Sequence, residues 1–175
     1  MASSSGYLQY SFVLPAALTV LGWFIVARQA DRRDYRKEVR EHIGDLHEVA
    51  GVVRVGATEY WLNSTPKTAA GAAVSLKAEV KRLSRQVTAL TAAGLHFEGA
   101  TLMGEVRKAA TGGDFEKAGR KHSPDDVERV TDLIGALEDL LLAVDAAFYA
   151  KFKPMTRLRL WRYVPLLGTF ALTRG

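Results

Sequence analysis

The sequence predicts an all-α protein in which an N-terminal transmembrane helix continues into a cytoplasmic antiparallel helical bundle or coiled coil. Three observations favour this fold class: an uncharged apolar run near the start, heptad-spaced apolar residues further on, and no segment with the alternating pattern of a strand. The chain of 175 residues suffices for one folded domain and a membrane segment. We expect an extracytoplasmic stub at 1–6, the span at 7–27, the bundle at 28–153 and a basic aromatic tail at 154–175.

The run at residues 7–27 carries no charged side chain. At about 1.5 Å per residue, a helix over this run reaches roughly 30 Å, the thickness of a bilayer's hydrocarbon core. Tyr7, Tyr10 and Trp23 stand where interfacial aromatic residues are expected, and the basic residues after Trp23 place that side in the cytoplasm. Two alternatives are a cleaved signal peptide, which needs a basic segment that residues 1–6 lack, and a buried core helix, which the polar residues within the run leave open.

Basic residues gather at both ends of the chain that follows the run. Residues 28–40 contain six basic side chains against three acidic ones, and residues 151–175 contain six basic side chains and no acidic one. Beside a membrane span, such clusters are typical of contacts with anionic lipid headgroups. The residues that we expect at the membrane interface are Trp23, Arg28, Arg32, Arg33, Arg36, Lys37, Arg157, Arg159, Trp161, Arg162 and Tyr163.

Three later segments carry apolar residues at alternating steps of three and four, the spacing of a helix face that packs on another helix. They run from Val39 to Tyr60, from Ala73 to Leu90 and from Val127 to Phe148, with a shorter helix expected at 99–110 and a loop at 111–123. The residues expected to pack between helices are Val39, Ile43, Leu46, Val53, Leu76, Val80, Leu83, Val87, Ile134, Leu137, Leu141, Val144 and Phe148.

The expected helix boundaries carry turn and capping signals. Residues 63–66 end the first helix, Gly94 follows the second as a C-cap glycine, and Ser123 with Pro124 opens the last as N-cap and first helical residue. Short connections favour antiparallel neighbours, which brings the C-terminus back toward the membrane. The tail then lies in the lipid interface, docks on a partner, or caps the bundle core with Trp161 and Tyr163.

The sequence contains no recognisable catalytic, cofactor or metal motif. The absence of cysteine excludes disulfides, zinc–thiolate sites and cysteine nucleophiles, and neither a phosphate-binding glycine loop nor a serine-nucleophile motif occurs. Glu38 and His42 form one Glu-x-x-x-His pair, but no second motif completes a bundle metal site. We therefore expect no enzyme, cofactor or nucleic-acid partner; an enzyme would instead gather His42 or His47 with several carboxylates in a cleft.

The string LGWFIVARQADRRDYRKEVR at positions 21–40 resembles the start of a group of small bacterial single-span membrane proteins. In that group an apolar helix ending in LGWF-like residues runs into an Arg-rich juxtamembrane helix. The resemblance covers the N-terminal part of the chain and implies a membrane-anchored helical protein. It carries no assigned activity and no functional residues.

These observations predict a non-enzymatic interaction or assembly protein of the bacterial inner membrane, with its N-terminus outside and its bundle in the cytoplasm. The expected partners are the anionic cytoplasmic leaflet and either further copies of the chain or other subunits of a membrane complex. The alternative is a membrane effector of bacterial defence or toxin type that acts through oligomerisation of its span, with Gln9, Ser11 and Thr19 as polar contacts between copies.

Overall fold

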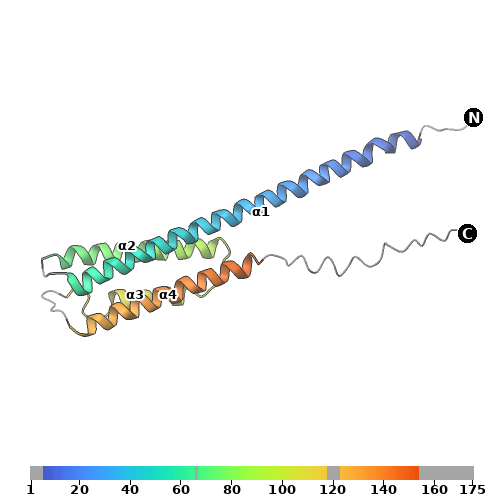
Figure 1. The fold of residues 1–175 in the computed structure, drawn as a ribbon. Helices are drawn as coiled ribbons and strands as arrows, with labels where there is room; N and C mark the ends of the chain where they lie inside the picture. Colours follow the sequence, from blue (N-terminus) through green and yellow to red (C-terminus); the bar gives the residue numbers. More distant parts are fainter. Residues whose placement is uncertain (1–5, 66, 118–122, 154–175) are drawn as a thin grey trace, which may run out of the picture.

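The computed structural model of the protein describes residues 6–65, 67–117 and 123–153, with side chains from Pro15 onward. These residues form four α-helices, α1 (Gly6–Thr58), α2 (Ala69–Ala92), α3 (Gly99–Thr111) and α4 (Asp125–Lys151), and no strand (Figure 1). A π-helical turn, η1 (Glu59–Asn63), extends α1. The prediction of an all-α fold is confirmed for this part of the chain.

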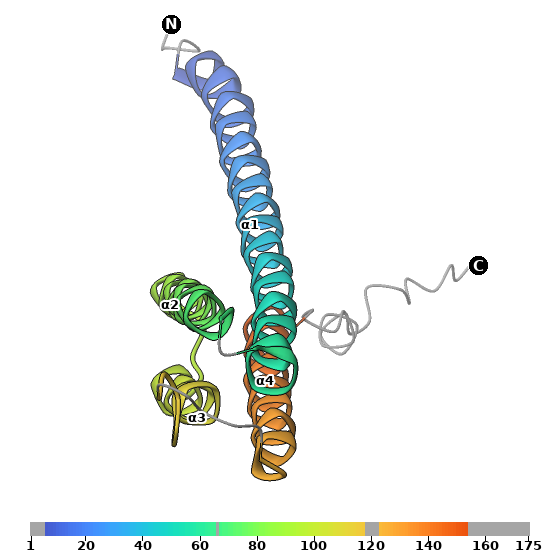
Figure 2. The ribbon, with the colours of Figure 1, turned by 90° about the vertical axis from the view of Figure 1, so that its left-hand side faces the viewer.

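The helices run alternately away from and back toward the N-terminal end of the molecule (Figure 1). Viewed along the long axis, they stand at the four corners of a bundle in which consecutive helices are neighbours and α4 lies beside α1 (Figure 2). The first half of α1 projects from the bundle, and every described side chain of residues 15–38 is exposed. The bundle has two ends, which we name as follows. At the near end, α1 leaves the bundle and α4 ends. At the far end, the chain passes from α1 to α2.

The expected packing residues of α1 and α2 all lie in the bundle core. Burial of each removes apolar surface from water and stabilises the fold by roughly 1.5–3 kcal/mol per large side chain. None of them exposes more than 6% of its surface: Val39, Ile43, Leu46, Val53, Leu76, Val80, Leu83 and Val87. The short helix α3 adds Met103, Val106 and Ala110 from a third side.

On α4 the buried stripe differs from the one that the sequence pattern indicates. Leu137, Val144 and Phe148 are buried as expected, but Ile134 and Leu141 are only partly buried and Val127 is 57% exposed, so its assignment to the stripe is wrong. Leu133 and Leu140 are buried instead. The physical reason is that α4 packs more closely on α3 than on α1, which turns the stripe toward α3.

Two capping structures fix the helix ends that the sequence marks. At the end of α2, Gly94 has a φ of +74°, its N–H donates to the Thr91 carbonyl, and the Leu95 N–H donates to the Leu90 carbonyl. This is a Schellman motif, and the buried Leu90 and Leu95 supply its usual apolar contact. The left-handed conformation of Gly94 is one that L side chains rarely adopt, which explains the glycine.

Ser123 and Asp126 hydrogen-bond each other across the start of α4, an arrangement that resembles part of a capping box. The Ser123 N–H donates to the Asp126 carboxylate at 2.8 Å, and the Asp125 N–H lies 3.3 Å from the Ser123 hydroxyl. The side chain of Asp126 is buried, and the hydrogen bond from the Ser123 N–H satisfies its carboxylate. The backbone N–H groups at a helix start have no acceptor within the helix, and these side chains supply acceptors for two of them. The start of α4, which the sequence predicts from Ser123 and Pro124, is therefore stabilised by hydrogen bonds of both Ser123 and Asp126.

Candidate interaction surfaces

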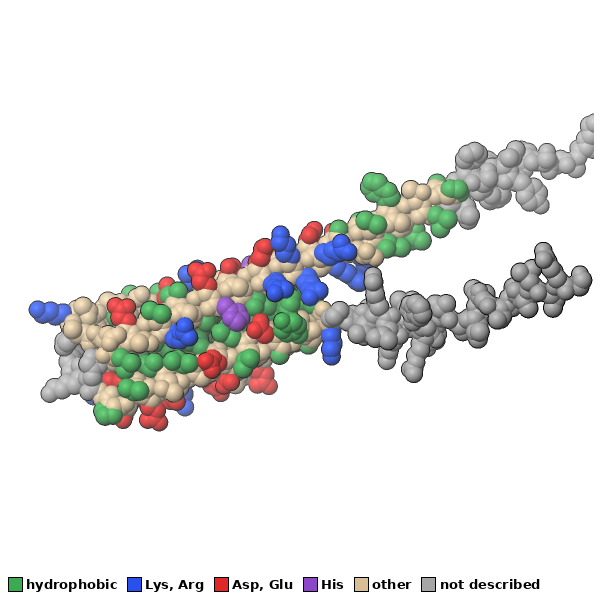
Figure 3. Space-filling view, viewed as in Figure 1, with side chains coloured by type: hydrophobic (Ala, Val, Ile, Leu, Met, Phe, Trp, Pro, Cys, Tyr) green, Lys and Arg blue, Asp and Glu red, His purple; other side chains and the backbone are tan. Residues whose placement is uncertain are grey.

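The projecting part of α1 presents large apolar side chains around its whole circumference. Trp23 is 79% exposed and Val20 is 70% exposed, and the neighbouring apolar residues are similarly uncovered: Leu18, Leu21, Phe24, Ile25 and Val26. Figure 3 shows these side chains standing away from the bundle, followed along the helix by a group of basic residues. Residues 15–26 therefore form an apolar surface that no other described part of the chain covers.

Among the described residues, no helix combines the length and the apolar character that crossing a membrane requires. The side chains of residues 7–14, the first part of the expected span, lie outside the described residues. Within the described part, Thr19 donates its hydroxyl to the Pro15 carbonyl at 2.8 Å, so one of its polar atoms already has a partner in its own helix.

The predicted interface residues of the juxtamembrane segment are all exposed on α1: Arg28, Arg32, Arg33, Arg36 and Lys37. Arg36 also reaches back to the bundle, where its guanidinium centre lies 5.9 Å from the centroid of the Phe148 ring. The remaining predicted interface residues lie outside the described residues: Arg157, Arg159, Trp161, Arg162 and Tyr163.

A hydrogen-bonded clamp closes the near end of the bundle. The Lys151 ammonium donates to the Ala93 carbonyl at 2.6 Å, to the Gly94 carbonyl at 3.1 Å and to the Tyr35 hydroxyl at 2.9 Å. The Tyr35 hydroxyl donates to the same Ala93 carbonyl, and the Tyr35 ring lies against Phe152. The clamp thus joins the projecting helix α1 to the ends of α2 and α4, and the sequence pattern did not reveal it.

An aromatic cluster closes the far end. The buried indole N–H of Trp61 donates to the Ala110 carbonyl at 3.1 Å, and the Tyr60 hydroxyl accepts the Glu116 N–H at 2.8 Å. Phe115 packs on Tyr60 with ring centroids 4.7 Å apart. These contacts connect the π-helical turn to the end of α3 and to the loop that follows α3. We therefore assign the aromatic cluster a role in stabilising the far end of the bundle.

Of the described histidines, His47 has an acidic neighbour on another helix. His47 Nε2 lies 3.6 Å from the Asp145 carboxylate across the interface between α1 and α4, with both side chains more than 40% exposed. No group of three or more metal-ligating side chains occurs in the described part of the chain. His47 also lines a pocket of about 230 Å³ between α1 and α4, in which Glu138 is the one carboxylate of the lining.

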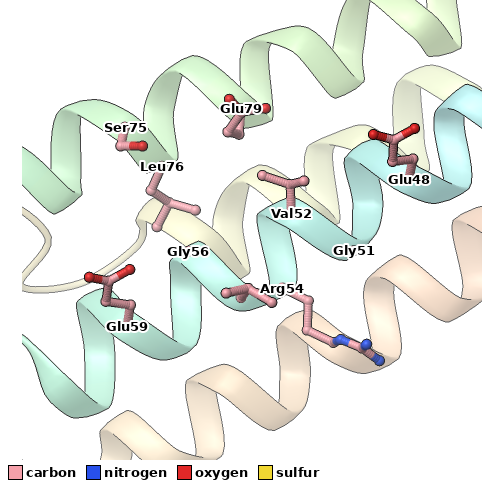
Figure 4. Close-up of a pocket in the computed structure, with 10 residues that line it drawn as sticks. Glu48, Gly51, Val52, Arg54, Gly56, Glu59, Ser75, Leu76 and Glu79 are labelled. Atoms are coloured by element: carbon pink, nitrogen blue, oxygen red, sulfur yellow. The ribbon is translucent and has the colours of Figure 1, made fainter.

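A groove of about 470 Å³ runs between α1 and α2. Val52, Val55 and Leu76 supply its apolar lining, and Gly51 and Gly56 open the surface of α1 between them (Figure 4). A β-carbon added at Gly51 would meet no atom within 4 Å, and Val55 is 62% exposed. We call this feature the α1–α2 groove.

Three carboxylates stand around the α1–α2 groove: Glu48 on α1, Glu59 at the start of η1, and Glu79 on α2. Glu79 Oε2 is buried and has no hydrogen-bond partner within the described residues, and its nearest cation is Arg82 at 3.9 Å. The one basic residue of the lining, Arg54, extends toward α4 and away from α2 (Figure 4). The α1–α2 groove is therefore apolar at its floor and acidic at its rim.

Comparison of the chain with protein-family models, curated proteins and solved structures found no match. The class of protein is therefore defined by the described structure alone. It is an all-α protein, a four-helix bundle with one helix that projects far beyond the others.

Proposed function

We propose that this protein is a membrane-anchored interaction protein without enzymatic activity, whose residues 7–27 cross the bilayer and whose bundle assembles with other proteins or copies on the cytoplasmic side. The observation that carries the proposal is the apolar surface at residues 15–26, exposed on every side of α1 and followed by a basic segment. A large apolar surface rimmed by polar residues is typical of a membrane or protein contact. Basic residues beside it suit the anionic cytoplasmic leaflet.

The continuous helix supports a rigid attachment. α1 runs without a break from Gly6 to Thr58, and the clamp around Lys151 fastens it to α2 and α4 where it enters the bundle. Residues 28–38 lie between the apolar surface and the first core residue, Val39, and span roughly 16 Å at about 1.5 Å per residue. This length supports an arrangement in which the bundle stands just beyond the headgroup layer.

Membrane attachment is tested by alkaline extraction of the full chain from bacterial membranes. We expect the protein to stay in the membrane pellet, and the double substitution Leu21→Glu and Ile25→Glu to release it, because charged side chains in the hydrocarbon core are costly. Tyr149→Glu, on an exposed residue of α4, is the matched control and leaves extraction unchanged. Release of the unaltered chain by alkali would reject the anchor.

Orientation and assembly need separate measurements. Because the chain has no cysteine, Ser4→Cys and Thr88→Cys each introduce a single thiol. We expect a membrane-impermeant maleimide to label the first in intact spheroplasts and the second only after lysis. A mass measurement in mild detergent then tests assembly: a bare monomer without co-purified protein contradicts the proposed interaction role.

A further inference from the structure

We propose that the α1–α2 groove is the docking site of this chain's own C-terminal segment, residues 154–175. The inference is independent of the membrane anchor, because it concerns a surface of the bundle and a segment that begins at the end of α4. Four observations carry it: the shape of the α1–α2 groove, its charge, the composition of the segment, and the distance between them.

The α1–α2 groove offers space and apolar contact for an extended or helical segment. Val52 and Val55 lie outside the heptad stripe of α1 and are 41% and 62% exposed, so they are large apolar side chains that the bundle leaves uncovered. A β-carbon added at Gly51 would meet no atom within 4 Å, and one added at Gly56 would lie 3.9 Å from the Leu76 Cδ1 atom of α2, an ordinary contact distance. A segment with apolar side chains would cover this surface, as in the binding of amphipathic helices to apolar grooves.

The negative charge at the rim of the α1–α2 groove favours a basic occupant. Glu48, Glu59 and Glu79 face it, and Glu79 Oε2 is a buried acceptor without a hydrogen-bond donor among the described residues. A buried carboxylate oxygen without a donor is costly, so a guanidinium group that reaches it would be favourable. Arg54 does not fill this role, because its side chain turns toward α4 (Figure 4).

The C-terminal segment has the complementary composition. It contains Arg157, Arg159, Arg162 and Arg174 and no acidic residue. Between and after the first three arginines stand large apolar side chains: Leu158, Leu160, Trp161, Val164, Leu166, Leu167 and Phe170. Within the described bundle no stretch of similar length combines several arginines with so many large apolar residues and lacks acids.

The segment is long enough to reach the α1–α2 groove in the same molecule. It begins beside Lys151, which contacts Tyr35, and Glu48 lies roughly 20 Å from Tyr35 along α1 at about 1.5 Å per residue. Residues 154–162 cover up to roughly 30 Å when extended. The three clustered arginines can therefore reach the near rim, and the apolar residues after them fall along Val52 and Val55.

Disulfide trapping in the full chain, performed in native membranes, tests the docking. The cysteine-free sequence allows one pair to be introduced, Val55→Cys with Leu166→Cys. The matched pair is Leu142→Cys with Leu166→Cys, since Leu142 is 67% exposed and lies closer to the segment in sequence, but on α4. We expect the first pair to form its disulfide about fivefold faster than the second.

A variant that blocks the α1–α2 groove without disturbing the fold sharpens the test. Gly51→Leu adds a side chain where a β-carbon meets open space, and it should abolish the rapid trapping of residue 55. Gly135→Leu is the control, because Gly135 on α4 is equally open and lies outside the α1–α2 groove. Replacing the three rim glutamates by glutamine should slow trapping by about fivefold.

Several outcomes overturn the proposal: equal trapping of both pairs, trapping that survives Gly51→Leu, or no trapping while a thiol at residue 166 reacts with a lipid-phase probe. The last result would assign the segment to the bilayer instead. Mixing chains that carry only Val55→Cys with chains that carry only Leu166→Cys decides the geometry. A disulfide-linked dimer at the rate of the double-cysteine chain would overturn docking within one molecule and assign the α1–α2 groove to the segment of a second copy. No dimer in this mixture, together with rapid trapping in the double-cysteine chain, is the result expected for docking within one chain.

Discussion

The ammonium group of Lys151 on α4 lies 2.6 Å from the carbonyl oxygen of Ala93 at the end of α2, which stands 58 residues earlier in the sequence. The same ammonium contacts Tyr35 of α1, so one side chain joins three helices at the end where the projecting helix leaves the bundle. A lysine near a helix C-terminus can bond the last carbonyl groups and interact favourably with the helix dipole.

Replacing Lys151 by methionine should therefore lower the free energy of unfolding by about 1 kcal/mol, because the Ala93 and Gly94 carbonyls lose a charged donor at a partly solvated site. Urea denaturation of the full chain in mild detergent, followed by helical circular dichroism, measures the change. Lys153→Met, two residues further on, should leave stability unaltered; an equal loss in both variants would show that general charge, and not the clamp, is responsible.

Two glycines should respond to alanine with opposite signs. Gly94→Ala forces a left-handed conformation on an L residue and places its β-carbon 2.9 Å from the Lys151 Nζ atom, so we expect a loss of about 1–2 kcal/mol. Gly135→Ala, in the middle of α4 with open space around it, should stabilise the protein by about 0.5–1 kcal/mol. Thermal unfolding of the two variants side by side provides the measurement, and a shared sign would contradict the structure.

The far-end cluster depends on a buried hydrogen bond. Trp61→Phe keeps an aromatic ring but removes the N–H that the Ala110 carbonyl accepts, and it should cost about 1–3 kcal/mol of unfolding free energy. Trp23→Phe on α1 is the control: Trp23 is 79% exposed, and its replacement should change stability by less than about 0.5 kcal/mol. Chemical denaturation distinguishes the two, and equal effects would place Trp61 outside the core.

The position of the buried stripe on α4 can be checked with a second pair. Leu133 is 1% exposed and Val127 is 57% exposed, although the heptad pattern includes Val127 and omits Leu133. Leu133→Ala should lower the unfolding free energy by about 2–5 kcal/mol, and Val127→Ala by no more than about 0.5 kcal/mol. The denaturant midpoints of the two variants measure the difference. A larger loss of stability in Val127→Ala than in Leu133→Ala would contradict the structure and support the packing face that the heptad pattern predicts.

The helices and several of their ends could be predicted because they depend on local physics. Heptad spacing identified the packing faces of α1 and α2, Gly94 marked the end of α2, and Ser123 with Pro124 marked the start of α4. Each of these signals acts within a few residues, through side-chain periodicity, left-handed backbone conformation or capping hydrogen bonds.

The tertiary structure alone decided the features that join distant parts of the chain. The stripe of α4 could not be predicted, because Leu140, Leu141 and Leu142 stand side by side in the sequence and only the closer packing on α3 selects Leu140. Likewise no local pattern pairs Lys151 with Ala93, which stands 58 residues earlier in the sequence. The acidic rim of the α1–α2 groove exists only because α2 brings Glu79 beside α1. Local periodicity therefore fixes which faces can pack, whereas contacts between helices fix which of them do.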